Sequence, residues 1–229
     1  MLLGVKRSLS FVAVGAVMAL LLGPATLASG PKPETTRLNA ADQAAARAVV
    51  VRRADLQPAS GWMGGSIKPE SIVVNCPYYH PDLSRFVTTG QAASRWSRKS
   101  SGLIVVTTEA SVSQTARMQR EELRIQLQPA AVRCVRSIYS KQATAAGVTL
   151  ISFERVSFPH IATYSAAFEA RVRWVGPNGQ DGRSAGELVF LGQGRTAITL
   201  VVSGPQSARA SLVAACKRLA RIVAGRIQP

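Results

Sequence analysis

Histidine and cysteine are scarce in this chain, and most metal sites and many catalytic sites depend on them. The 229 residues include two histidines and three cysteines, with no C-x-x-C pair and no acidic cluster beside them. We therefore expect no metal site, because zinc centres need several such ligands at short spacings. No glycine cluster stands between a strand and a helix, and no G-x-S-x-G motif occurs. The sequence thus predicts neither a nucleotide cofactor nor a nucleophile elbow.

His80, Asp82 and Ser84 stand close together in the sequence, but this is not evidence for a hydrolytic triad. The members of a triad are brought together from distant segments by the fold. We interpret His80 as a loop residue and expect the protein not to be an enzyme and to need no cofactor.

Acidic residues are also few, which leaves the chain strongly basic. There are 12 Asp and Glu against 28 Lys and Arg, a formal net charge of +16. A field of this sign attracts partners rich in phosphate or carboxylate. The basic residues are scattered, without a run of five, and we predict no specific nucleic-acid partner. Two interpretations stay open. Either the charge attracts an anionic partner such as a lipid headgroup or wall polymer, or it only keeps the protein soluble and reflects the abundance of arginine codons in a GC-rich genome.

The N-terminal residues 1–28 have the pattern of a secretory signal peptide. Lys6 and Arg7 precede an apolar run from Phe11 to Leu22, and Thr26-Leu27-Ala28 offers small residues for cleavage. The alternative is an uncleaved anchor, because no further charge appears before Lys32. The apolar run is nevertheless shorter than the roughly 20 residues that cross a bilayer. We predict a secreted or extracytoplasmic protein, either free or tethered by this segment.

Three cysteines in an oxidising compartment are expected to form one disulfide and leave one thiol. Cys216 lies on the apolar stripe of the last predicted helix, together with Leu212 and Leu219. We therefore interpret Cys216 as a buried, unpaired core residue. This leaves Cys76 to pair with Cys134, and the long loop between them would make the bridge worth about 4 kcal/mol.

The rest of the sequence predicts one α+β domain over residues 42–229, after a flexible lead-in over residues 29–41. Alternating apolar residues predict strands, and apolar stripes at helical spacing predict helices. In the first half, the predicted elements are a helix Ala40–Arg53, a loop Trp62–Gly65, a short strand or extended segment Ile67–Asn75, strands Ala92–Lys99 and Leu103–Val112, and a helix capped by Ser113 and running to about Gln128. They continue with a helix opened by Pro129, strands Val148–Phe158, Thr163–Val175, Ser184–Leu191 and Thr196–Ser203, and a helix Ser207–Arg226.

The hairpin connections between the later strands make the expected sheet mostly antiparallel. A sheet with one apolar face must be covered, and the helices are the available cover. The expected fold is therefore a two-layer α+β sandwich with about five to six strands.

Two short motifs resemble a known family of exported domains. Ala54-Asp55-Leu56 is followed by Gly61-Trp62, and Cys76 to Leu83 reads Cys-Pro-x-x-x-Pro-Asp-Leu, with a helix ending near a second cysteine. Over residues 40–228 the chain resembles the extracellular sensor domain of actinobacterial Ser/Thr kinases of the PknH type, whose fold is similar to the Mog1/PsbP-like sandwich. The resemblance implies a Cys76–Cys134 bridge and ligand sensing rather than catalysis. The family's second bridge would need a partner for Cys216 that this chain lacks.

An aromatic group around Cys76 is the first candidate binding site. It comprises Tyr78, Tyr79 and Trp96, with Trp62 and His80 nearby in the sequence. Aromatic faces and tyrosine hydroxyls on a rigid loop suit sugars, lipids or a protein partner. The alternative is that the disulfide packs these rings into a small satellite core.

A basic strand face is the second candidate. Arg171 and Arg173 alternate on the predicted solvent side of the longest strand, beside Glu169, and Arg183 could oppose them across the hairpin. Guanidinium groups arranged in this way could bind an anionic ligand. The alternative is an ordinary solvated face.

The last predicted helix is also basic on one side, opposite its apolar stripe. Its basic residues are Lys217, Arg218, Arg221 and Arg226. Such a helix can lie on an anionic membrane, unless its apolar side packs on the sheet.

The function expected from these features is an exported, non-catalytic binding or sensing module. Its ligand would be an envelope small molecule, lipid or anionic wall component, bound between the sheet and the loop around Cys76. The alternatives are an enzyme that acts on envelope material and a cationic structural envelope protein.

Overall fold

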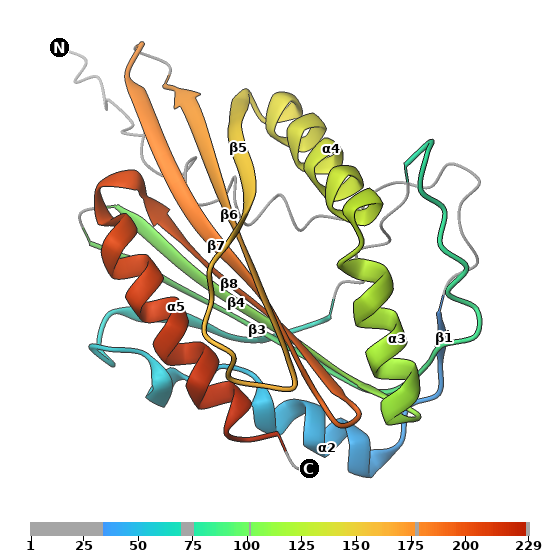
Figure 1. Cartoon of the computed structure of the whole chain (residues 1–229). Helices are drawn as coiled ribbons and strands as arrows, with labels where there is room; N and C mark the ends of the chain where they lie inside the picture. Colours follow the sequence, from blue (N-terminus) through green and yellow to red (C-terminus); the bar gives the residue numbers. More distant parts are fainter. Residues whose placement is uncertain (1–33, 70–75, 101, 177–178, 228–229) are drawn as a thin grey trace, which may run out of the picture.

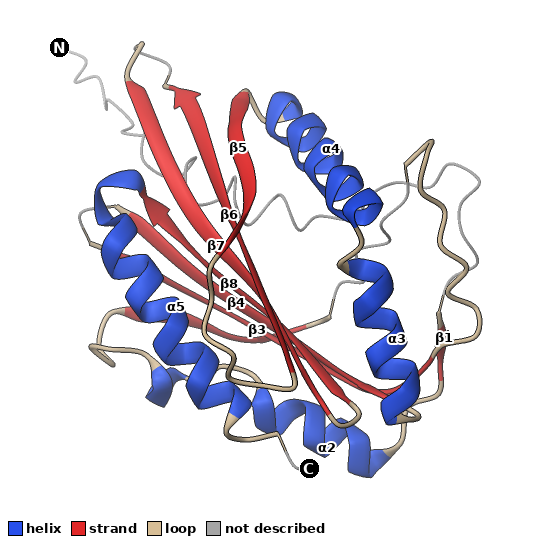
Figure 2. Ribbon diagram, in the orientation of Figure 1, coloured by secondary structure: helices blue, strands red, loops and turns tan. Residues whose placement is uncertain are grey.

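A central β-sheet with helices on both faces makes up the fold, as Figure 1 and Figure 2 show. The computed structural model describes residues 34–69, 76–100, 102–176 and 179–227. The predicted signal peptide, residues 1–28, lies outside the described residues, as does most of the extended segment predicted over residues 67–75.

Eight strands and four α-helices follow one another within the described residues. The strands are β1 (Thr35–Thr36), β2 (Trp62–Ile67), β3 (Val87–Lys99), β4 (Leu103–Ser113), β5 (Val148–Val156), β6 (Tyr164–Val175), β7 (Asp181–Gln193) and β8 (Thr196–Pro205). The helices are α2 (Ala40–Val49), α3 (Ala116–Gln126), α4 (Pro129–Ala145) and α5 (Arg209–Ala224), with short 3₁₀ turns η1 (Arg53–Asp55) and η2 (Gln206–Ala208).

The strands form one sheet in the order β1-β3-β4-β8-β7-β6-β5, with β2 also paired to β3. All pairs are antiparallel except β1 with β3. The prediction of a mostly antiparallel α+β fold is therefore confirmed. Thr35–Thr36 pair with Val87 and Thr88, so this part of the predicted lead-in belongs to the sheet.

Helices cover both faces of the sheet, so the fold has three layers, and the expectation of a two-layer sandwich with helices on one face is wrong. Val189 and Leu191 of β7 pack in the core beneath α2 and α5, whereas Leu188 and Phe190 pack in a second core beside α4. Successive residues of a strand point to opposite faces, so an uninterrupted apolar run needs cover on both sides. We call the two helical layers the α2/α5 layer and the α3/α4 layer.

The sheet also has more strands than the five to six expected, because its edge strands carry weak patterns. β2 has the sequence WMGGSI, which we interpreted as a loop with Trp62 as an anchor. It pairs with Ala93 to Arg98 of β3 over its whole length. The register of β2 is set by hydrogen bonds to the backbone of β3. The alternation of apolar and polar residues within β2 itself cannot reveal such a partner.

Local signals define the helix starts well. The Asn39 side chain accepts a hydrogen bond from the Asp42 backbone N–H, and Pro129 opens α4 as predicted. The cap of α3 is Thr115, whose hydroxyl accepts from the Met118 N–H, and not Ser113, which ends β4. Side-chain oxygens at these positions satisfy N–H groups that the first helical turn leaves free.

The disulfide joins Cys76 to Cys134 of α4, with a Cα–Cα distance of 5.7 Å, which confirms the predicted pairing. Cys216 is fully buried and free, also as predicted. Backbone hydrogen bonds in both directions between Cys76 and Tyr79 close the loop. The Tyr79 hydroxyl then donates to the Ile125 carbonyl at 2.7 Å and fixes the loop to α3.

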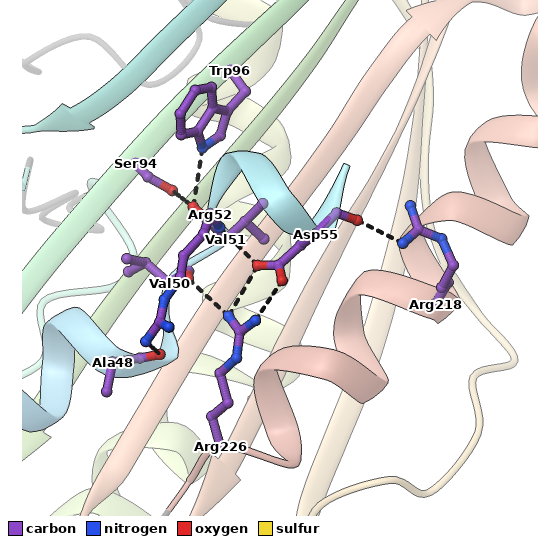
Figure 3. A network of polar contacts seen from close by, with 9 residues as sticks. All are labelled: Ala48, Val50, Val51, Arg52, Asp55, Ser94, Trp96, Arg218 and Arg226. Atoms are coloured by element: carbon purple, nitrogen blue, oxygen red, sulfur yellow. Dashed lines mark hydrogen bonds and ion pairs between the residues drawn. The ribbon is translucent and has the colours of Figure 1, made fainter. Parts of the chain in front are cut away.

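A buried ion pair connects the N-terminal helix region to the C-terminal helix (Figure 3). Both carboxylate oxygens of Asp55 accept from Arg226, and Oδ2 also accepts from the Arg52 backbone N–H at 2.8 Å. Arg218 donates to the Asp55 carbonyl at 2.6 Å. Burial alone would raise the pKa of Asp55, but the hydrogen bonds from Arg226 and Arg52 lower it.

The same segment is fastened to the sheet. The Val51 carbonyl accepts from the Ser94 hydroxyl at 2.8 Å and from the Trp96 indole N–H at 3.0 Å. The chain between α2 and β2 is therefore held by the strand beneath it and by α5 beside it.

Removing the disulfide should destabilise the domain. Its loop spans a sequence separation of 58 residues, so the double variant Cys76→Ser/Cys134→Ser should lose about 4 kcal/mol of unfolding free energy through the freed unfolded chain. Urea unfolding measures this loss. Non-reducing peptide mapping should recover Cys76 joined to Cys134, with Cys216 alkylated only after unfolding. A Cys134–Cys216 peptide would show that the assignment is wrong.

Asp55→Asn should destabilise the fold by about 2–3 kcal/mol, because it leaves a partly buried guanidinium without its carboxylate. The matched control is Asp181→Asn, whose ion pair with Arg173 is about half exposed and should be worth less than about 1 kcal/mol. The folded-state pKa of Asp55 lies below its ordinary value of 3.8. The difference between wild type and Asp55→Asn should therefore be complete at neutral pH and disappear in acid. An equal effect of the two variants at neutral pH would contradict the structural role of Asp55.

Candidate functional site

The structure divides the predicted site residues among three separate places. Trp62 is buried in the core under the α2/α5 layer, with the Arg98 guanidinium 5.3 Å from its ring centroid. Trp96 is half-buried against the same core, and its indole N–H donates a hydrogen bond to the Val51 carbonyl. Neither ring joins the loop around Cys76, because that loop lies on α3 and α4, across the sheet.

Tyr78, Tyr79 and His80 stay together in the disulfide loop. Tyr78 is 54% exposed, whereas Tyr79 is half-buried and hydrogen-bonded to α3. Burial raises the pKa of Tyr79, so its hydroxyl remains a donor. The loop therefore presents Tyr78 and His80 to the surface and uses Tyr79 as an anchor.

The hydroxyl of Ser84 is committed to a local turn. It donates to Asp82 Oδ1 at 2.6 Å, and the Ser84 backbone N–H donates to the same oxygen at 3.0 Å. An aspartate that bonds a backbone N–H two residues ahead forms an Asx-turn. The proximity of Asp82 and Ser84 in the sequence thus serves a local turn.

The strands β6 and β7 extend beyond the start of α5 (Figure 1). Three arginines lie on this part of the two strands, and a fourth is the first residue of α5. Arg173 of β6 lies directly opposite Arg183 of β7 and has Thr149 of β5 on its other side. Arg171 precedes Arg173 by two residues and lies on the same face of β6. Arg209, the first residue of α5, reaches Glu169 on this face. We call Arg171, Arg173, Arg183 and Arg209 the arginine face.

Two carboxylates hold three of these arginines in place. Arg173 Nε donates to Asp181 at 2.9 Å, and this hydrogen bond raises the pKa of Arg173. Arg209 Nε donates to Glu169 at 2.6 Å, and Arg171 lies 3.4 Å from the other Glu169 oxygen. Arg171 Nε also donates to the Ser152 hydroxyl at 2.8 Å. Within the described residues no ion pair reaches Arg183.

The arginines remain accessible despite these contacts. The side chains of Arg173 and Arg209 are each 52% exposed and that of Arg171 is 41% exposed. Guanidinium groups can bind carboxylate or phosphate oxygens through two parallel hydrogen bonds. The arginine face can therefore receive an anion without a change of fold.

The prediction of a wet strand face is wrong for Glu169, which is buried beneath the start of α5. Glu187 lies directly opposite it on β7 and is buried as well. Sequence alternation placed Glu169 on the correct side of β6. It could not indicate that α5 would cross that side and that Arg209 would become its partner, since the two are 40 positions apart.

Glu187 and Cys216 form a buried polar contact between β7 and α5. Burial raises the pKa of Glu187, while a hydrogen bond to the Cys216 thiol lowers it in part. Burial and the nearby Glu187 carboxyl raise the pKa of Cys216 well above its ordinary value. A nucleophilic cysteine needs a depressed pKa and access to solvent, so Cys216 serves packing here.

A second acidic pair lies at α3. Burial and the neighbouring Glu34 carboxylate raise the pKa of Glu122 to about 7, and a hydrogen bond from Gln126 offsets part of the rise. Burial also raises the pKa of Glu34. The two like charges disfavour simultaneous ionisation of Glu34 and Glu122.

No group of three or more His, Cys, Asp or Glu side chains that could hold a metal ion occurs within the described residues. Among the helices of those same residues, none is long and apolar enough to cross a membrane. In comparisons with known proteins, no family model, no curated protein and no solved structure matches this chain.

Glu122→Gln should stabilise the protein in alkali and leave its acid stability unchanged. A carboxyl whose folded-state pKa is raised holds its proton more tightly when folded, so stability falls as pH rises from about 4.5 to about 7. The variant should therefore gain about 1–2 kcal/mol at pH 8 relative to wild type, as measured by urea unfolding across pH. Glu121→Gln, which removes an ion pair with Arg85, is the control and should not gain stability at pH 8. A gain of equal size at pH 4 would contradict the assignment.

Proposed function

We propose that this protein is a non-catalytic, extracytoplasmic binding module that recognises an anionic component of the cell envelope through the arginine face. The observation that carries the proposal is the cross-strand pair of Arg173 and Arg183, with Arg171 and Arg209 beside it. Like charges directly opposite each other in an antiparallel pair are unfavourable unless an anion lies between them.

The balance of charges supports an anionic ligand. Asp181 and Glu169 form ion pairs with three of the four arginines of this face, Arg173, Arg209 and Arg171. The buried Glu187 lies opposite Glu169, so the four guanidinium groups still outnumber the nearby carboxyl groups. The excess charge lies on two strands and the start of a helix, which position side chains more firmly than a loop does. A phosphate or carboxylate group on the ligand would complete the pairing.

The disulfide supports an extracytoplasmic location. Structural disulfides persist mainly in oxidising compartments, and Cys76–Cys134 connects the aromatic loop to α4. Tyr78 and His80 of that loop are exposed, and we keep them as a second predicted surface for ligand contact. They lie across the sheet from the arginine face, so a small ligand would bind one surface or the other.

Two other functions from different classes remain testable alongside this one. An enzyme acting on envelope material would need a nucleophile or an acid–base pair, and the Ser84 hydroxyl and the Cys216 thiol are committed to structural contacts. A cationic structural protein would hold anions by net charge alone. It would not distinguish the arginine face from other basic surfaces.

The double variant Arg173→Gln/Arg183→Gln should lose roughly tenfold or more in affinity for a soluble polyanion, because it removes two charge-assisted contacts. Polyphosphate and polygalacturonate serve as probes for phosphate and carboxylate chemistry, and isothermal titration at two salt concentrations measures the affinity.

The matched control is Arg133→Gln/Arg136→Gln, two exposed arginines of α4 with the same loss of charge. The control should bind as wild type does. Equal losses in the two double variants would favour binding by net charge alone, and no binding of either probe by wild type would overturn the proposed function.

A further inference from the structure

The outer surface of the α2/α5 layer is basic and carries no free acidic side chain among its described residues. Its basic side chains are Arg47, Arg52, Arg53, Lys217, Arg218 and Arg221. The acidic residues of α2 and η1 are Asp42 and Asp55, and each forms an ion pair, with Arg195 and Arg226 respectively. The helix α5 contains no acidic residue at all.

This charge lies on a preformed and broad surface. The α2 helix packs over β3 and β4, while α5 packs over β7 and β8, so together they cover one side of the sheet (Figure 1). The Asp55–Arg226 ion pair and the Arg218 hydrogen bond join the two parts of the layer (Figure 3). The exposed charges are therefore spread over two helices from opposite ends of the chain.

The layer has no apolar side left for insertion into lipid. Leu212, Leu219 and Val223 of α5 are buried against the sheet, as is Cys216. None of the large exposed apolar side chains in the described part of the chain belongs to α2, η1 or α5: they are Leu38, which comes just before the N-cap of α2, and Met63, Tyr78, Ile151 and Val175. Any attraction to a surface must therefore be electrostatic.

We propose that the α2/α5 layer docks on the surface of an anionic lipid bilayer, by electrostatic attraction alone. Charge spread evenly over a helical layer matches a planar partner, whereas a linear polymer is better matched by a compact row such as the arginine face. The apolar run that ends at Leu22 closely precedes the first described residue, Glu34, in the sequence. Export would thus release the domain beside a bilayer, whether or not that run is cleaved.

Docking in this way fixes the orientation of the domain. The α2/α5 layer faces the lipid headgroups, while the α3/α4 layer and the disulfide loop face the aqueous compartment. This inference goes beyond the proposed function, because it names a second partner and uses arginines outside the arginine face.

The test is sedimentation with vesicles of phosphatidylglycerol in phosphatidylcholine, with pure phosphatidylcholine vesicles as the uncharged reference. The triple variant Arg47→Gln/Arg53→Gln/Arg221→Gln changes three exposed side chains of the layer. We expect the affinity to fall about fivefold per charge removed, hence on the order of 100-fold for the triple variant. Wild-type binding should weaken steeply as salt is added, because the Debye length shortens.

The matched control is Arg133→Gln/Arg136→Gln/Lys141→Gln, which removes three exposed charges from α4 on the opposite layer. This control has the same net charge as the test variant, and it should keep most of the wild-type affinity. Equal losses in the two triple variants would overturn the proposed orientation. Absence of binding to the anionic vesicles, or binding that salt leaves unchanged, would overturn the docking itself.

The two proposals fail separately. A protein that binds soluble polyanions but not anionic vesicles would disprove the docking and leave the proposed function standing. A protein that binds anionic vesicles but no soluble polyanion would disprove the proposed function and leave the docking standing. Circular dichroism of the two triple variants should show that the fold is retained, because each changes exposed side chains for which no ion pair is found among the described residues.

Discussion

The central strands β7 and β8 are apolar on both faces, and the arrangement of the remaining elements follows from this constraint. Leu188 and Phe190 need cover on one side of β7, and Val189 and Leu191 need cover on the other. Each apolar side chain removed from water contributes about 1.5–3 kcal/mol, so neither face can be left open. Two helical layers are the result, and the apolar stripe of α5 is used entirely for one of them.

This use of the helices determines where charge can gather. The helix α5 begins partway along β6 and β7, so the far ends of these strands stay uncovered and carry the arginine face. Its first residue, Arg209, forms an ion pair with the buried Glu169. Acidic residues are thus drawn beneath the helices or into ion pairs, while many arginines remain outside. The excess of basic residues therefore lies on the surface, on the arginine face, on the α2/α5 layer and on α4, where Arg133, Arg136 and Lys141 are exposed.

Contacts between distant segments then fix the two layers. Asp55 accepts from Arg226 across 171 positions of sequence, and Cys76 is joined to Cys134 across 58. The first contact holds α2 and α5 as one layer, and the second holds the aromatic loop on the other layer. Both involve residues that the sequence motifs around Asp55 and Cys76 had already made conspicuous. The partner of Asp55, however, came from a helix end that no local pattern connects to it.

The sequence alone determined the local features of this protein. Alternation and helical stripes predicted the long strands and the helices, Pro129 marked a helix start, and the apolar environment of Cys216 left Cys76 and Cys134 to pair. These signals depend on a few neighbouring residues. The tertiary structure decided the number of layers, the pairing of β2 with β3, the burial of Glu169 and the separation of Trp62 from Tyr78. Those features depend on which faces meet across the sheet, and a pattern read along one strand carries no information about the element that will cover it.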